Sequence, residues 1–110
     1  MKEFFEYLKN GEFRIPICTS CDRKVWPPFH YCPYCLQKTT LQKIQTIGTL
    51  IEFSKSYMKD KEGTFGVIEV SGIKLVGSFS VDNLKEGIKV KMSSCGINPD
   101  GSVFYNFVKA

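Results

Sequence analysis

Four of the five cysteines in this 110-residue chain form two Cys-x-x-Cys pairs within one stretch, "CTSCDRKVWPPFHYCPYC". Two residues between thiolates let one tight turn direct both sulfurs at a single ion, and a second such turn completes a tetrahedral set. We therefore predict a Zn²⁺ site with Cys18, Cys21, Cys32 and Cys35 as its ligands. Because four thiolates fill the coordination shell, the predicted role of the metal is structural rather than catalytic.

Three other interpretations of these cysteines remain open. Two disulfides are disfavoured if the protein is cytoplasmic, and a redox-active pair normally begins a helix in a βαβ unit, a pattern absent here. Iron in a rubredoxin-like site uses the same ligand set, so the sequence does not separate it from zinc. The N-terminal stretch "MKEFFEYLKN" carries acids among its aromatics, unlike a secretory signal, and no apolar run approaches the ~20 residues of a membrane span. These features predict a cytoplasmic protein with no membrane association.

Side chains suited to catalysis are scarce. His30 is the single histidine, in a loop beside a complete set of four cysteine ligands, where a solvated ring is the simpler interpretation. Cys95 ends a predicted strand with no evident base to activate it, which favours a small buried hydrophobe. No phosphate-binding glycine loop or nucleophile motif is present. We predict that the chain is not an enzyme.

Binding residues are easier to identify. Aromatic side chains crowd the cysteine stretch at Trp26, Phe29, Tyr31 and Tyr34, beside two cations. Such platforms suit bases, adenine rings and phosphates, although small zinc domains also use aromatics as their core. By charge and aromaticity, the candidate ligand-binding residues are Arg23, Lys24, Lys55, Tyr57 and Lys59.

The elements that must position these residues fall into three segments. Phe4, Phe5 and Leu8 have helical spacing before a stop at Gly11, which predicts a short helix at 2–10 within segment 1–11. Such a helix is stable only when it docks, so Phe4, Phe5, Leu8 and Trp26 are candidate partner-docking residues. Residues 12–43 form the predicted zinc ribbon. Period-two alternation across 44–110, as in "IKLVGSFSV", predicts five strands and an OB-fold barrel with a reduced helix at "VDNLKEG". The predicted fold is therefore mainly β.

Net charge is +4, a mild excess of cations that permits an anionic partner without requiring one. A barrel of this type with exposed aromatics would also suit single-stranded nucleic acid. We keep that function as the alternative interpretation.

The order of motifs resembles a known family across nearly the whole chain: an aromatic helix, the cysteine stretch with Pro27–Pro28, and a barrel opening "IGTLIEFSKSYM" and closing "DNLKEGIKVKM". The family combines a rubredoxin-like zinc ribbon with an OB-fold; it was once called a domain of unknown function and is now called acyl-CoA-associated. Members commonly have Arg after the Pro-Pro and Gly after each cysteine pair. This chain has Phe29, Asp22 and Leu36 at those places.

The resemblance implies a non-catalytic accessory or scaffold protein. Its implied partner is a thiolase-like or hydroxymethylglutaryl-CoA synthase-like enzyme, and acyl-CoA is an implied ligand. Family members are typically encoded beside thiolase-like enzymes, and some look like bridges between two enzymes that pass on a CoA thioester. An OB barrel by itself does not decide the ligand, because this fold carries many functions.

Overall fold

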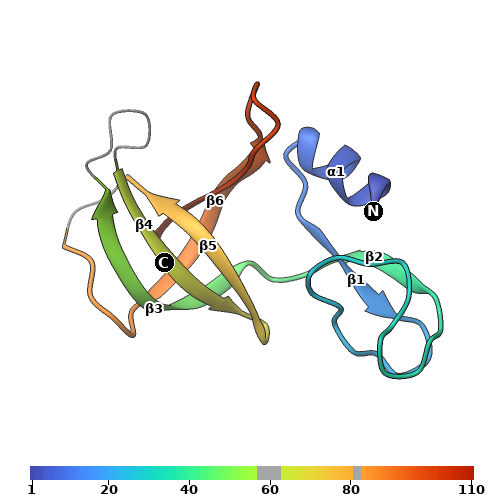
Figure 1. The fold of residues 1–110 in the computed structure, drawn as a ribbon. Helices are drawn as coiled ribbons and strands as arrows, with labels where there is room; N and C mark the ends of the chain where they lie inside the picture. Colours follow the sequence, from blue (N-terminus) through green and yellow to red (C-terminus); the bar gives the residue numbers. More distant parts are fainter. Residues whose placement is uncertain (57–62, 81–82) are drawn as a thin grey trace. The chain divides into compact units, whose positions relative to one another are not determined.

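A computed structural model describes residues 1–56, 63–80 and 83–110 (Figure 1). The chain divides into two compact units, Met1–Ile44 and Gln45–Ala110. The elements, in chain order, are α1 Lys2–Lys9, β1 Arg14–Cys18, β2 Thr39–Lys43, β3 Ile47–Ser56, β4 Gly63–Val70, β5 Ile73–Phe79, β6 Lys89–Ile97 and β7 Val103–Lys109. Within the described ranges, no helix has the length and apolar character needed to cross a membrane.

The helix of the first unit, α1, is held by an aromatic cluster. Phe4 and Leu8, one turn apart, are both buried, and Gly11 follows the helix end with a φ of 77°. The ring of Phe4 lies edge-on to Phe13 and to Trp26, with centroid distances of 6.3 and 5.7 Å. The short helix thus obtains from side-chain packing the stability that eight residues cannot provide alone.

Two short strands complete the first unit. β1 and β2 pair antiparallel, from Arg14 opposite Lys43 to Cys18 opposite Thr39. The twenty residues between these strands carry three of the four clustered cysteines, and Cys18 ends β1. The sheet therefore anchors both ends of the cysteine stretch.

The second unit is a closed five-stranded barrel with the order β3-β4-β5-β7-β6, closed by pairing of β3 with β6 (Figure 1). All neighbouring strands are antiparallel except β5 and β7, which run parallel where Ser78 and Phe79 meet Asn106 and Phe107. This arrangement confirms the predicted fold class: one N-terminal helix, a zinc ribbon and a small OB-type barrel. Residues 83–88, in the segment expected to hold a reduced helix, contain no helix, and only Glu86 and Gly87 form a turn.

The barrel core follows the predicted alternation of apolar side chains. β5 has the burial order expected of a strand with one buried face, with Ile73, Leu75 and Phe79 inside. Gly77 interrupts this apolar row because the ring of Phe107 occupies the space: a Cβ on Gly77 would lie 2.5 Å from the Phe107 ring. β3 shifts register between Leu50 and Glu52, which produces the bend expected of a long first strand.

Candidate metal centre

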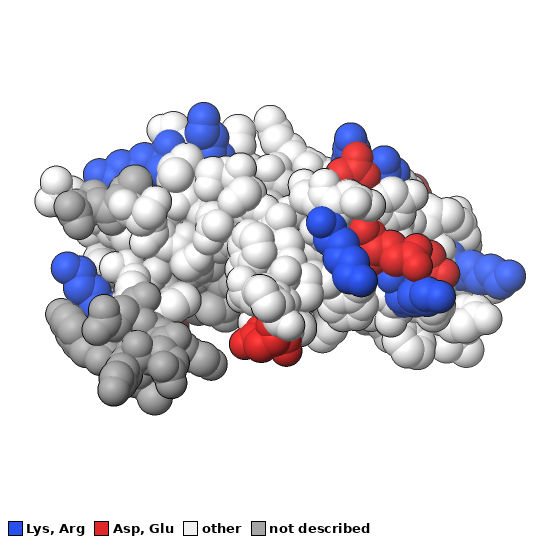
Figure 2. Space-filling view, turned by 90° about the horizontal axis from the view of Figure 1, so that it is seen from above, with Lys and Arg blue, Asp and Glu red and all other residues white. Residues whose placement is uncertain are grey.

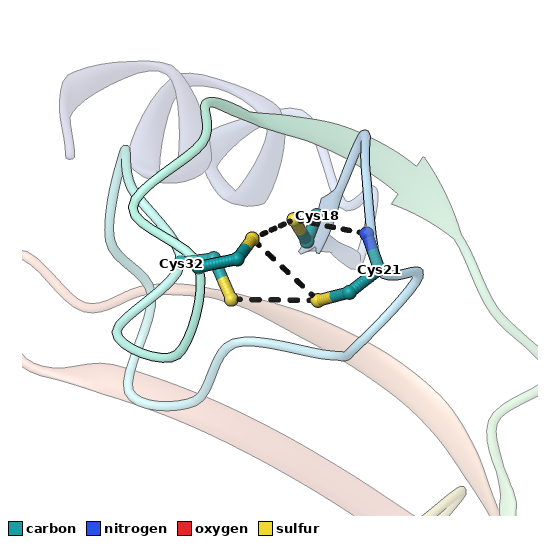
Figure 3. A group of neighbouring side chains, drawn as sticks. Cys18, Cys21 and Cys32 are labelled. Carbon is teal, nitrogen blue, oxygen red and sulfur yellow. Dashed lines mark hydrogen bonds between the residues drawn. The ribbon is translucent and has the colours of Figure 1, made fainter.

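The four clustered cysteine sulfurs meet at one point in the first unit. All lie within 4.8 Å of one another. The Cys18–Cys35, Cys21–Cys32 and Cys21–Cys35 sulfur distances are 3.2, 3.7 and 3.8 Å (Figure 3). A tetrahedral ion with metal–sulfur bonds of about 2.3 Å has sulfur–sulfur edges of about 3.8 Å. The donor set and its spacing therefore fit one zinc ion bound by four cysteine thiolates.

The two cysteine pairs sit on two turns with the same backbone pattern. The N–H of Cys18 donates to the carbonyl of Arg23, and the N–H of Asp22 donates back to Cys18, at 2.9 and 3.1 Å. The second turn repeats these offsets: Cys32 donates to Gln37 and Leu36 donates to Cys32, both at 2.9 Å. The flanking bridges repeat as well, between Ile17 and Lys24 and between Tyr31 and Lys38. The same turn geometry therefore occurs twice, and the two turns direct their four cysteine sulfurs toward one point.

Each turn requires a left-handed residue directly after its second cysteine. Asp22 has a φ of 59° and Leu36 a φ of 62°, values that glycine adopts most readily. These are the two positions at which the family resembled by this sequence commonly has glycine. Asp tolerates the conformation better than Leu does, so the backbone strain is greater at Leu36.

The thiols of the cluster ionise unequally. Backbone N–H donation by Cys21 is the main cause that lowers the pKa of Cys18 to about 6. The backbone N–H of Gln37 acts to lower the pKa of Cys35. Contacts of the Cys35 thiol with Cys18, Cys21 and Cys32, together with its desolvation, oppose ionisation more strongly and raise this pKa to about 12. Four thiolates this close repel one another, and a divalent cation removes that penalty. The electrostatics therefore favour a bound dication.

The cluster also forms the small core of its part of the chain. Cys18, Val25 and Cys32 are buried against one another, with Cys35 packed beside them. Cys21 is the exposed member of the set. Because four sulfurs already complete a tetrahedron, the arrangement provides structural clamping, with no ligand position left for a reacting water.

The predicted ligand-binding residues are only partly brought together. Arg23 lies in the first cysteine turn, with its guanidinium carbon 4.2 Å from the ring centroid of Tyr34, and Lys24 is exposed beside it. Lys55 is exposed on β3 of the second unit. Tyr57 and Lys59 lie outside the described residues. A ligand-binding role for these five residues stays a prediction.

The predicted docking residues have unequal access to solvent. Phe4 and Leu8 are 3% and 0% exposed within their own unit, and Trp26 is half-buried in the same aromatic cluster. Phe5 is 42% exposed, so the docking prediction for the helix now depends on that side chain.

The two other candidates for chemistry take no part in the cluster. His30 is exposed, and its backbone carbonyl accepts a hydrogen bond from the N–H of Thr39 at 2.8 Å. Cys95 is buried in the barrel, as expected, and desolvation raises its pKa.

A group of exposed apolar side chains lies on the second cysteine turn and the residues before it. We call it the hairpin surface: Phe29, Tyr31, Tyr34 and Leu36, which are 59%, 47%, 71% and 75% exposed. The rings of Phe29 and Tyr31 touch edge-on at 6.5 Å. The sequence indicated the three aromatics but not Leu36, whose exposure follows from its place in the left-handed turn.

Comparison with known proteins agrees with this geometry. Residues 5–40, about a third of the chain, match the family model described as "ChsH2, rubredoxin-like zinc ribbon domain". A solved structure titled "Ltp2-ChsH2(DUF35) aldolase" contains a chain similar in fold, with a TM-score of 0.77 and 17% sequence identity. That alignment covers 98% of this chain and 92% of the other. A search of curated proteins gave no match. The resemblance inferred from the sequence is thus confirmed for the zinc ribbon, and the fold likeness extends over both units.

Proposed function

We propose that this chain is a non-catalytic accessory subunit, clamped by one structural zinc, that binds a thiolase-superfamily enzyme. One observation carries the proposal. The fold of this chain is similar, over nearly the full length of both chains, to that of a chain in the structure titled "Ltp2-ChsH2(DUF35) aldolase". The match of residues 5–40 to the zinc ribbon model of ChsH2, the protein that the same title names, also supports it.

The chemistry of the site agrees with an accessory role. The one cluster of potential metal ligands found among the described residues is the closed four-cysteine set, which leaves no site for metal-bound water. Neither the exposed His30 nor the buried Cys95 belongs to this four-cysteine set. Catalysis in such an assembly would belong to the partner enzyme, and acyl-CoA would reach this chain only as a ligand.

The hairpin surface is the docking site that we propose on the first unit, together with Phe5. Apolar side chains this exposed mark interaction sites when they are contiguous, and Tyr, Phe and Arg are frequent anchors of interfaces. Arg23, stacked on Tyr34, adds a cation whose ring contact already limits its conformations. A partner with an apolar surface bordered by acidic side chains would complement this set.

A capture experiment tests the proposal. Thiolase-superfamily enzymes encoded in the same genome are expressed with an affinity tag, together with the untagged chain, and co-purification is measured. We expect one of them to retain the chain, and Phe29→Ser with Tyr34→Ser to abolish retention. Val76→Ser is the matched control, because Val76 is 65% exposed on β5 of the barrel.

Two results would contradict the proposal. One is failure of every such enzyme to retain the chain. The other is tight, salt-sensitive binding of a single-stranded oligonucleotide without capture, which would favour the nucleic-acid alternative. The metal is tested separately by elemental analysis, where one zinc per chain is expected and stoichiometric iron would contradict the zinc assignment.

A further inference from the structure

A hollow of about 520 Å³ in the barrel unit is lined by several cations. It lies where the turn before β6 meets the end of β7, and half of its described lining residues are lysines: Asn83, Lys85, Ile88, Lys89, Lys109 and Ala110. None of these described lining side chains is acidic. The neighbouring carboxylate, Glu86, contributes to a different hollow, beside Glu52 and Phe53.

The three lysines are not paired with any acidic side chain of the described residues, although Ala110, whose α-carboxylate is anionic, belongs to the same lining. Among the described lysines, only Lys43 forms an ion pair, with its ammonium 3.5 Å from a carboxylate oxygen of Glu12. On the face seen in Figure 2, acidic and basic side chains likewise adjoin on the right of the view. Within residues 1–56, 63–80 and 83–110, Lys85, Lys89 and Lys109 form no ion pair. Three ammonium groups around one hollow repel each other, and a bound anion would relieve this repulsion.

The backbone fixes where these lysines stand. The N–H of Gly87 donates to Leu50 at 2.7 Å, and the N–H of Leu50 donates to Ile88 at 3.0 Å, which joins the turn to β3. The N–H of Ala110 donates to the carbonyl of Lys89 at 3.1 Å, which joins the end of the chain to β6. Only the side chains need to move on binding, so the entropic cost of assembling the site is small.

We propose that this hollow, the lysine hollow, binds the phosphate groups of a small phosphorylated molecule. Lysine ammonium groups bind phosphate as point charges, and three of them match the charge of a diphosphate better than that of a single carboxylate. The volume lies within the ~300–1,000 Å³ usual for small-molecule sites, and Ile88 supplies an apolar wall for the rest of the ligand. Lys89, whose ammonium donates to the Thr49 hydroxyl at 3.3 Å, is already turned toward β3 at the rim. The proposal goes beyond the accessory function and depends on neither the zinc nor the partner.

Calorimetric titration with inorganic pyrophosphate tests the site, using a tag at the N-terminus so that Ala110 is unaltered. We expect one binding site per chain, whose affinity falls as salt is raised from about 50 to 200 mM. The variant Lys85→Gln, Lys89→Gln, Lys109→Gln should lose at least about tenfold in affinity, because each lysine contributes a charge-assisted contact. The matched control is Lys2→Gln, Lys38→Gln, Lys74→Gln, which removes the same charge from exposed positions that are not part of the hollow's lining.

A second measurement uses the unaltered protein and so does not depend on how the variants fold. Reductive methylation followed by mass spectrometry should show that pyrophosphate protects Lys85, Lys89 and Lys109 but leaves Lys2, Lys38 and Lys74 reactive. Equal binding by the hollow variant and the wild type would overturn the proposal, as would equal protection of both sets. Binding of a single-stranded oligonucleotide by a protein that ignores pyrophosphate would overturn it too.

Discussion

The two units of this chain solve the same stability problem by different means. The barrel closes five strands on an apolar interior in which Leu50, Ile68, Val90 and Phe107 are at most 1% exposed. The first unit has two strands of five residues and an eight-residue helix, and its cysteine stretch contributes a core of only a few side chains. Its four-cysteine metal site provides the stability that so small an apolar core does not.

The difference shows what limits each unit. Small domains with little core commonly need a metal or disulfides, because buried area alone does not offset chain entropy. The barrel needs no such addition, but its interior tolerates little change in volume, as close-packed cores do. The first unit should therefore lose stability when the metal or a buried aromatic side chain is removed. The barrel should lose stability when a larger side chain is introduced into its interior.

Metal removal should have the largest effect. Binding to structural zinc sites contributes roughly 10–16 kcal/mol in small zinc-finger peptides, so chelation at neutral pH, or Cys32→Ser, should unfold the first unit. Trp26 is the single tryptophan of the chain and lies in this unit, so its fluorescence reports unfolding there. Hydrogen exchange of β3–β7 amides reports on the barrel and should stay slow.

Cys95→Ser provides the control for cysteine loss, because that thiol lies in the barrel and outside the cluster. It should leave Trp26 fluorescence and zinc content unchanged. Unaltered fluorescence after complete zinc removal would show that the aromatic cluster alone sustains the first unit. Rapid exchange throughout the barrel would show that the two units unfold together.

Phe4→Ala should rank next. The ring is 3% exposed and contacts both Phe13 and Trp26, and loss of a buried Phe typically costs about 3–5 kcal/mol. The expected result is a lower midpoint for the Trp26 transition in urea, with the barrel transition unchanged. Phe5→Ala is the matched control one residue away, since Phe5 is 42% exposed. Similar losses in the two variants would show that both rings are buried in solution.

Gly77→Ala tests the barrel in the opposite direction. Its methyl group would lie 2.5 Å from the Phe107 ring, and overpacking of this kind costs about 1–3 kcal/mol. Thermal unfolding followed by β-sheet circular dichroism should show the loss, while zinc content stays at the wild-type value. Combining it with Phe107→Leu should recover part of the stability. Additive losses in the double variant would mean that the two residues do not compete for the same space.

The sequence predicted the architecture because its strongest signals are local. Apolar alternation in β5 and a helical spacing of Phe4 and Leu8 each identify an element, and the Cys-x-x-Cys spacing identifies a set of metal donors. Each of these signals arises within a few residues of chain. Local physics therefore determined the element types and the cysteine cluster.

The parts that escaped prediction depend on contacts between distant residues. Gly77 looked like a gap in an apolar row until Phe107, thirty residues later in the chain, proved to fill it. The lysine hollow brings Lys89 and Lys109 together through the pairing of β6 with β7, which no spacing in the sequence reveals. The burial of Phe4 inside its own unit depends in the same way on contacts with Phe13 and Trp26.

The smallest effect should be a gain, at Leu36. A left-handed backbone costs a residue with a Cβ about 1–2 kcal/mol, and glycine loses part of that advantage through its greater freedom when unfolded. Because the Leu36 side chain is 75% exposed, little burial is lost, and Leu36→Gly should stabilise the first unit by roughly 0.5–1 kcal/mol. Leu36→Ala removes the same exposed side chain but keeps the Cβ, so it should give no gain. Denaturant titration of Trp26 fluorescence in the zinc-bound protein separates the two, and an equal gain from alanine would assign the effect to the exposed side chain rather than to φ.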